Sequence, residues 1–147
     1  MTCLECNTQL SYLDHRRSMD QFGAELCDRH LHRMERLIRD HRVPAEAVIL
    51  YYLLLENGTR AMLSWWDGKQ TVDLALSRVK LNIEIDTGGR PLTHNQALHQ
   101  LEETMHSFKN GFTCIRIPDY LIRNYRQDTL VYLQGIIGGL KSNLKVV

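Results

Sequence analysis

Apolar residues recur every three or four positions over residues 28–42, which predicts a helix with one apolar face. The apolar positions of this helix are Leu31, Met34, Leu37 and Ile38. A second helix is predicted from Pro44, which suits a first helical turn, to about Glu56, where an Asn-Gly pair stops it. Its apolar run is too short to cross a bilayer, which takes about 20 residues, so we expect a buried helix and no membrane partner.

Alternation of apolar and polar residues predicts three strands in the middle of the chain, at residues 60–66, 71–77 and 80–86. The Asp67-Gly68 pair that separates the first two strands is a strong hairpin signal. The polar face of the third strand is made of Asn82, Glu84 and Asp86.

Helical spacing returns at about residue 95 and ends near residue 109, where Asn110-Gly111 is a good stop signal. A β-branched strand over residues 112–117 and a last helix over about 128–140 follow, although three glycines weaken the last helical pattern. After a short N-terminal unit, the order is therefore two helices, three strands, a helix, a strand and a helix. This order predicts an α/β or α+β fold in which helices flank a sheet.

The composition is that of an ordinary soluble globular protein, and 147 residues suffice for one domain with a core plus a small appendage. The formal net charge is +1, so the chain has no overall basic character. A near-neutral total does not exclude a nucleic-acid partner, because local patches decide such binding.

Four potential metal ligands stand near the N-terminus: Cys3, Cys6, Cys27 and His30. They read Cys-x2-Cys and Cys-x2-His, and each short pair on a tight turn directs two side chains to one point. Four protein ligands leave no open position, so we expect a structural zinc ion. His32 is an alternative fourth ligand, and two coincidental pairs of buried thiols are the alternative to a metal site.

A knuckle, an intervening hairpin and a helix that carries the last two ligands resemble a treble-clef finger. We expect this finger and its helix to form a domain over residues 1–42, held together by zinc because it has too few apolar residues to fold alone. Metal-type cysteine spacing without a secretory leader predicts a reducing, cytoplasmic location. Arginines on the 28–42 helix are either phosphate contacts or part of a solvated face.

Two carboxylates are expected to meet on the sheet. If a turn at Arg78-Val79 joins the second and third strands, residues whose numbers sum to 157 lie opposite each other, and Asp73 faces Glu84. Their Cβ atoms would be about 5 Å apart. Two like charges this close repel each other unless water solvates that face of the sheet or a cation lies between them. Magnesium or manganese suits such oxygen ligands. A merely solvated strand face is the alternative.

Several short motifs follow one another in order between residues 43 and 137. They are Pro44-Ala45-Glu46, Val72-Asp73, the Leu81 to Asp86 strand, a Gly-rich break, a helix and the Gly111 to Ile117 strand. In this order they resemble the restriction-endonuclease-like superfamily, often written PD-(D/E)xK, and are most similar to its very-short-patch-repair-endonuclease-like branch. The resemblance implies a nuclease domain over residues 43–147, with a mixed sheet flanked by helices and magnesium- or manganese-dependent chemistry on DNA.

The resemblance also implies roles for individual residues. Asp73 would be the central metal ligand and Glu84 the second acidic position, with the carbonyl of Ile85 as a further ligand. Glu46 matches a helix glutamate that helps to hold metal in some members, and Asp86 matches an acidic position of this branch. The chain departs from the superfamily at Asp86, which stands where a lysine is usual in the superfamily, although this branch commonly lacks that lysine.

His94 is a candidate general base or phosphate contact, because histidine titrates near working pH. In the branch, a histidine soon follows an Asp-Gly pair, whereas here a longer run separates Asp86 from His94. A loop histidine that is merely exposed is the alternative.

The sequence therefore predicts a metal-dependent endonuclease that hydrolyses phosphodiester bonds of double-stranded DNA and carries a structural zinc finger. Two alternatives remain open. The first is a catalytically inactive nuclease fold that binds nucleic acid, and the second is a zinc-dependent protein-interaction adaptor.

Overall fold

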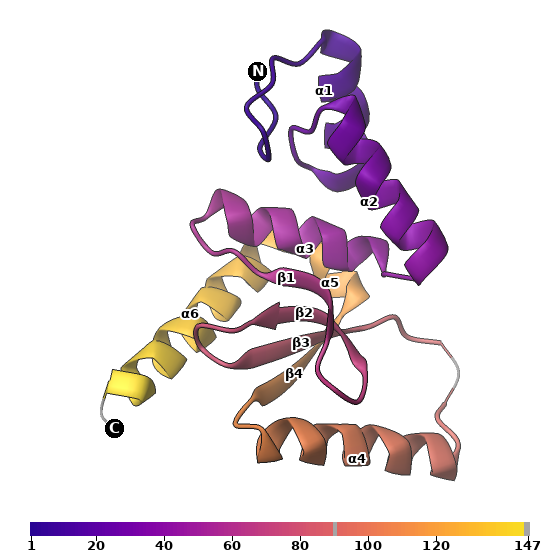
Figure 1. Cartoon of the computed structure of the whole chain (residues 1–147), viewed down its shortest axis with the longest axis vertical. Helices are drawn as coiled ribbons and strands as arrows, with labels where there is room; N and C mark the ends of the chain where they lie inside the picture. The colour runs from indigo at the N-terminus through magenta and orange to yellow at the C-terminus, as the bar shows by residue number, and fades with distance from the viewer. Residues whose placement is uncertain (90, 146–147) are drawn as a thin grey trace. The chain divides into compact units, whose positions relative to one another are not determined.

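The computed structural model describes residues 1–89 and 91–145, and the chain divides into two compact units, Met1–Arg60 and Ala61–Val147 (Figure 1). The first unit contains α1 (Tyr12–Phe22), α2 (Asp28–His41) and α3 (Ala45–Glu56). The second contains β1 (Met62–Trp66), β2 (Thr71–Leu76), β3 (Leu81–Asp86), α4 (His94–Lys109), β4 (Thr113–Pro118), α5 (Asp119–Asn124) and α6 (Arg126–Lys145). The predicted mixed α/β class is confirmed. None of the helices in the described residues is both long and apolar enough to cross a membrane.

Helix α1 stands where the sequence predicted a hairpin between the two ligand pairs, so that prediction was wrong. Ser11 caps the start of this helix, because its hydroxyl accepts a hydrogen bond from the Asp14 N–H at 3.1 Å, and Gly23 caps the end with a left-handed φ of 67°. It buries only Ser18 and Phe22. The helix therefore has no continuous apolar stripe by which a sequence pattern would reveal it.

The other two helices of this unit agree with the predicted ones. Helix α2 buries His30, Leu31 and Met34, so one face of it is inward, as its apolar period requires. Helix α3 is buried throughout residues 47–54. An all-round apolar helix of this kind has no solvated face, which is what the continuous run of apolar letters indicated.

The second unit is built on one four-stranded sheet in the order β1-β2-β3-β4. The first three strands are antiparallel, and β4 runs parallel to β3 after the α4 crossover. The β2–β3 register pairs Leu74 with Ile83 and Leu76 with Leu81. Both pairs sum to 157, so the predicted register is confirmed, with residues 77–80 as the turn.

The apolar side chains of β2 and β3 are buried, and they include Val72, Leu74, Leu81, Ile83 and Ile85. Helix α4 contacts β4, and α5 contacts both β4 and α6. Helix α5 was not predicted, and α6 extends beyond the predicted range of 128–140 at both ends.

The expected domain division at residues 42 and 43 differs from the division into compact units, because α3 groups with the N-terminal residues. A compact unit need not coincide with a domain, so the division between residues 1–42 and 43–147 stays a prediction.

Candidate functional site

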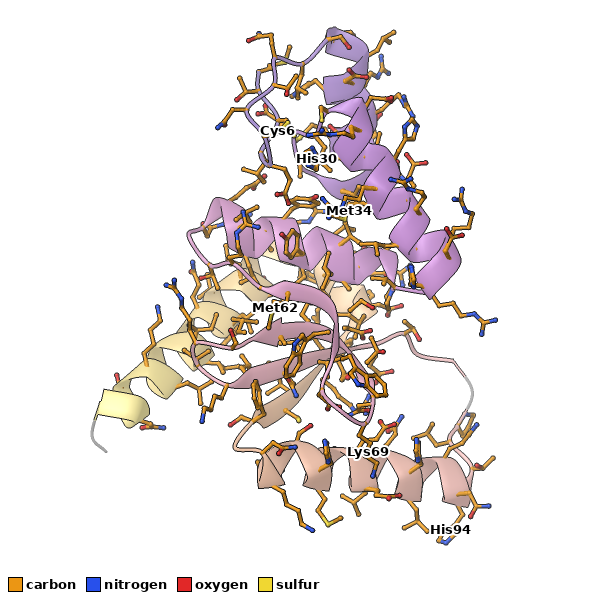
Figure 2. All side chains as sticks on the ribbon, in the orientation of Figure 1. Cys6, His30, Met34, Met62, Lys69 and His94 are labelled. Atoms are coloured by element: carbon orange, nitrogen blue, oxygen red, sulfur yellow. The ribbon has the colours of Figure 1, made fainter. Side chains whose placement is uncertain are left out.

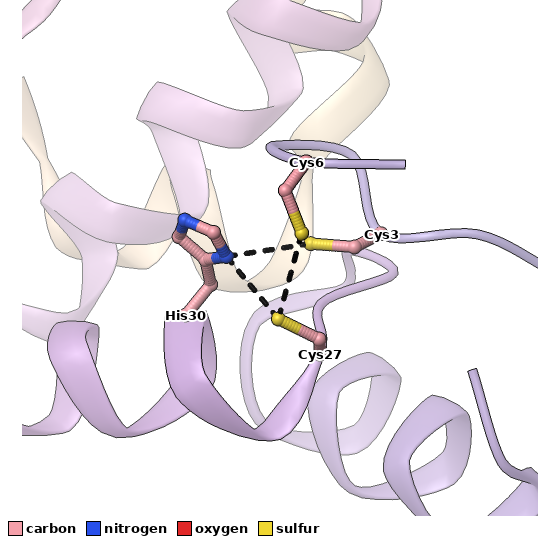
Figure 3. A group of neighbouring side chains, drawn as sticks. All are labelled: Cys3, Cys6, Cys27 and His30. Carbon is pink, nitrogen blue, oxygen red and sulfur yellow. Dashed lines mark hydrogen bonds between the residues drawn. The ribbon is translucent and has the colours of Figure 1, made fainter. Parts of the chain in front are cut away.

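The predicted zinc ligands converge on one point in the first unit. One ligand atom from each of Cys3, Cys6, Cys27 and His30 lies within 4.8 Å of all the others (Figure 3). His32, the alternative fourth ligand, is exposed, and its Nδ1 lies 3.3 Å from the Asp28 carboxylate instead. The four residues are therefore positioned to hold a metal ion.

Two of the three distances between ligand atoms match those around a tetrahedral ion, and the third is shorter by about 0.3 Å. The Sγ atoms of Cys6 and Cys27 are 3.8 Å apart, and Nδ1 of His30 lies 3.2 Å from the Cys27 Sγ and 3.7 Å from the Cys3 Sγ. Zinc with Zn–S bonds of about 2.3 Å and Zn–N bonds of about 2.1 Å separates its ligand atoms by about 3.5 to 3.8 Å. The donor set and its spacing are therefore compatible with zinc.

Local backbone structure brings the two ligand pairs into place. In the first pair, the Asn7 N–H donates to the Cys3 carbonyl at 2.9 Å, and Asn7 adopts a positive φ of 61° that closes the turn. In the second pair, Cys27 is the N-cap of α2, and His30 follows within the first turn of that helix. A helical turn places residues three apart on the same side, so both ligands face one centre.

Two of the thiols differ in acidity. The Thr8 side chain and backbone hydrogen-bond to Cys6 and lower the pKa of its thiol to about 6. Burial raises the pKa of Cys27. The thiolate is the form that binds metal, so Cys6 offers the more readily ionised ligand of the two.

The second candidate site is the carboxylate pair on the sheet. Asp73 of β2 and Glu84 of β3 lie side by side, beyond the last paired residues of the two strands, Leu74 and Ile83. There the Asp73 Oδ2 accepts a hydrogen bond from the Ile85 backbone N–H at 2.8 Å. This side-chain contact fixes the Asp73 carboxylate where the regular β2–β3 pairing has ended.

Glu84 is held in an environment that opposes its charge. Burial, and then the neighbouring Asp73 carboxylate, raise the pKa of Glu84 to about 8. Arg116 of β4 pairs with Glu84 in the sheet register and acts in the opposite direction. Because two adjacent carboxylates cannot both ionise easily, a cation placed between them would relieve the repulsion.

A polar pocket of about 190 Å³ opens beside Glu84, between the sheet and α4. Its lining comprises Gln70, Asn82, Glu84, Glu103, Thr104, Ser107, Cys114, Ile115 and Arg116. Asn82 is 2% exposed, and its Oδ1 has no hydrogen-bond partner within the described part of the chain. The pocket thus gives Glu84 an opening lined by further polar groups.

Two predicted catalytic residues, Asp86 and His94, are not brought to this pair by any contact described for residues 1–89 and 91–145. Asp86 is exposed and accepts a hydrogen bond from the Gly88 N–H at 3.0 Å. His94 is exposed at the first position of α4 (Figure 2). Glu46 lies in the first turn of α3, in the other unit. Their proposed roles stay predictions.

The structure also adds residues for which the sequence reasoning had no role, above all Gln70 and Glu103. With its amide oxygen and nitrogen exchanged, Gln70 donates to the Glu103 carboxylate at 3.1 Å. The signal that would have revealed Glu103 is the helical spacing of Gln100, Glu103 and Ser107, which gives α4 a polar inward side.

Comparison with protein-family models, with curated proteins and with solved structures finds no match to this chain. The superfamily resemblance therefore rests on the motifs and their order.

Proposed function

We propose that the chain is a metal-dependent endonuclease that hydrolyses DNA phosphodiester bonds, with Asp73 and Glu84 as the ligands of the catalytic cation. The observation that carries this proposal is the meeting of two carboxylates at the end of the β2–β3 ladder, beside a polar pocket. A raised carboxyl pKa beside a second carboxylate in a cleft is typical of a functional site.

The donor set suits magnesium or manganese. Magnesium binds to proteins through one or two carboxylates and fills its remaining positions with water and phosphate oxygens. Asp73 and Glu84 supply two carboxylates, and no group of three or more clustered acidic, cysteine or histidine ligands occurs near them in the described residues. When bound, such an ion supplies a nucleophile at neutral pH and stabilises charge on phosphate oxygens.

The surrounding residues would prepare this site. The Ile85 N–H orients the Asp73 carboxylate through its 2.8 Å hydrogen bond, so little ordering remains to be done when a cation binds. Arg116 is exposed on the strand next to Glu84, and its guanidinium would contact a phosphate oxygen of the bound DNA.

Two further observations support the proposal. The order α3, β1, β2, β3, α4, β4 is the order of elements in which the superfamily motifs stand. The Cys3, Cys6, Cys27 and His30 cluster has four protein ligands and no open position, so we propose that it holds a structural zinc ion that stabilises the first unit.

The test is nicking of supercoiled plasmid by the zinc-loaded protein with added magnesium or manganese. The informative variant is Asp73→Asn, because the amide oxygen can still accept the Ile85 hydrogen bond while the charge is lost. We expect this variant to lower the rate at least about a hundredfold. Asp119→Asn is the control, since Asp119 lies on α5 and binds only Arg123, at 3.1 Å, among its described contacts. Equal rates for wild type and Asp73→Asn would refute the assignment.

A nucleic-acid-binding module without catalysis is the second candidate. It is favoured by Asp86 and His94, neither of which is brought to the carboxylate pair by a described contact. This candidate predicts salt-sensitive DNA binding and no cleavage with either cation.

A further inference from the structure

Helix α4 carries its polar side inward. Gln100, Glu103, Thr104 and Ser107 recur at helical spacing and, with His106, are its less exposed residues, with Ser107 2% exposed. Ser107 accepts a hydrogen bond from the buried Asn82 amide at 3.4 Å, and three of the four line the polar pocket. The inward side of α4 therefore lines the carboxylate pocket and does not pack into an apolar core.

The opposite side of α4 is apolar and exposed. Leu98, Leu101, Met105 and Phe108, which we call the α4 stripe, are exposed by 52%, 66%, 49% and 58%. In Figure 1 this helix lies along the sheet of its own unit as a separate layer. An ordinary surface helix has the reverse polarity, with apolar residues toward the sheet and polar residues toward water. Four large apolar side chains in one exposed line indicate a docking surface.

The spacing of the α4 stripe is that of a helix–helix seam. Successive members are three, four and three residues apart, which is the alternation of a and d positions in packed helices. This order of spacings is the same whether the helix is followed from its N-terminus or from its C-terminus. A twofold interface needs a patch that is complementary to itself, and a palindromic stripe meets this condition on an antiparallel copy.

We propose that the α4 stripe is the interface of a symmetric dimer, in which α4 packs antiparallel against α4 of a second copy of this chain. A twofold axis midway between Leu101 and Met105 places each Leu101 against the other copy's Met105. The same axis places each Leu98 against the other copy's Phe108. A large aromatic side chain thus meets a smaller aliphatic one at both ends of the seam.

The charge beside the stripe is compatible with this pairing. Glu102 borders the stripe close to the axis, so the carboxylates of two copies approach each other there. Lys69, from the β1–β2 turn labelled in Figure 2, donates to Glu102 at 2.9 Å within each chain. This internal ion pair compensates the like charges. A single helix seam is small beside a typical interface of about 1,600 Å², so the dimer is expected to be weak and concentration-dependent.

The test is sedimentation equilibrium of the zinc-loaded full chain over micromolar to millimolar concentrations. Wild type is expected to dimerise, and the double variant Leu101→Glu, Met105→Glu is expected to weaken association at least about thirtyfold. Val131→Glu is the matched control, because Val131 is 63% exposed on α6 and outside the stripe, and it should dimerise like wild type. Thermal unfolding by circular dichroism checks that the variants remain folded.

A complementary pair of variants tests the antiparallel register. Leu101→Glu protein and Met105→Lys protein should each associate weakly alone, while an equimolar mixture should form a heterodimer, because Glu at 101 then faces Lys at 105. Stronger association in the mixture than in either variant alone would show that positions 101 and 105 face each other, even if both variants are weakened by their substitutions. A wild type that stays monomeric throughout the concentration range overturns the proposal. So does dimerisation that the double variant leaves unchanged, or a mixture that associates no better than its components.

Discussion

The carboxylate of Asp73 accepts a hydrogen bond from the backbone N–H of Ile85 at 2.8 Å, one step beyond the last residue pair of the β2–β3 ladder. Its neighbour Glu84 projects beside it with a pKa raised to about 8, first by burial and then by Asp73. Where Asp73 and Glu84 lie together, the Ile85 N–H is therefore bound by the Asp73 side chain and not by a backbone carbonyl of β2.

The first prediction concerns pH and stability in the absence of a catalytic cation. The folded-state pKa of Glu84 is about 8, above its usual value of 4.5, so the folded state binds this proton more tightly than the unfolded state. Its contribution to stability is therefore full below about pH 4.5 and is lost as the pH rises through about 8. Glu84→Gln should remove this loss and be the more stable protein above pH 8, by up to about 5 kcal/mol.

The measurement is the free energy of unfolding in urea at pH 4.5, 6.5 and 8.5, followed by tryptophan fluorescence. Both tryptophans, Trp65 and Trp66, lie in β1, so the signal reports the second unit. The quantity compared is the difference in free energy of unfolding between wild type and Glu84→Gln at each pH, because the contributions of the other titrating groups cancel in it. A difference that does not change with pH would show that Glu84 has an ordinary pKa.

The second prediction concerns the zinc cluster. Wild type should bind one zinc ion per chain. Cys27→Ser should weaken zinc binding more than about a hundredfold, because substitution of residues that merely orient metal ligands already lowers metal affinity by up to about that factor. Chelation of the ion should also reduce helical circular dichroism, because metal binding and folding are coupled in such units. Zinc content is measured with a chromophoric chelator after thiol modification.

Cys114→Ser is the matched control for this experiment. Cys114 lies on β4 in the other unit and is outside the ligand cluster, so this variant should retain its zinc. Undiminished zinc binding by Cys27→Ser would contradict the assignment of the cluster.

The third prediction concerns the start of α4. The Thr93 hydroxyl accepts a hydrogen bond from the Gln96 N–H at 3.2 Å, and the Gln96 side chain accepts one from the Thr93 N–H at 2.9 Å. Thr93→Ala removes one half of this capping box and should lower the free energy of unfolding by about 1 kcal/mol. Thr87→Ala, at an exposed position before the helix, should have little effect. Equal stability losses in urea unfolding would mean that the cap contributes nothing.

Some of this structure could be predicted because its signals are local. The alternation in β3 and the residues around Arg78-Val79 set the β2–β3 register, which in turn places Asp73 next to Glu84. The Cys-x2-Cys and Cys-x2-His pairs likewise lie on short turns, and the geometry of such turns depends on few residues, so the convergence of the four ligands could be predicted.

Other features could not be predicted because they depend on distant contacts or on weak patterns. Helix α1 buries only Ser18 and Phe22, so caps rather than an apolar stripe define it. Helix α4 could be predicted as a helix, but the sequence did not show which of its sides faces inward, and in the structure Ser107 and its polar neighbours do so. Which side of a helix faces inward depends on what the neighbouring strands present, here Asn82 and Glu84.

The central claim is that Asp73 and Glu84 together bind a divalent cation, and manganese binding tests it most directly. Zinc-loaded protein is titrated with manganese at pH 7.5, and free manganese is counted by electron paramagnetic resonance, with Asp119→Asn as control. We predict one manganese site in wild type and in the control, and at least tenfold weaker binding in both Asp73→Asn and Glu84→Gln. Manganese binding of equal strength in wild type and both pair variants would contradict the claim.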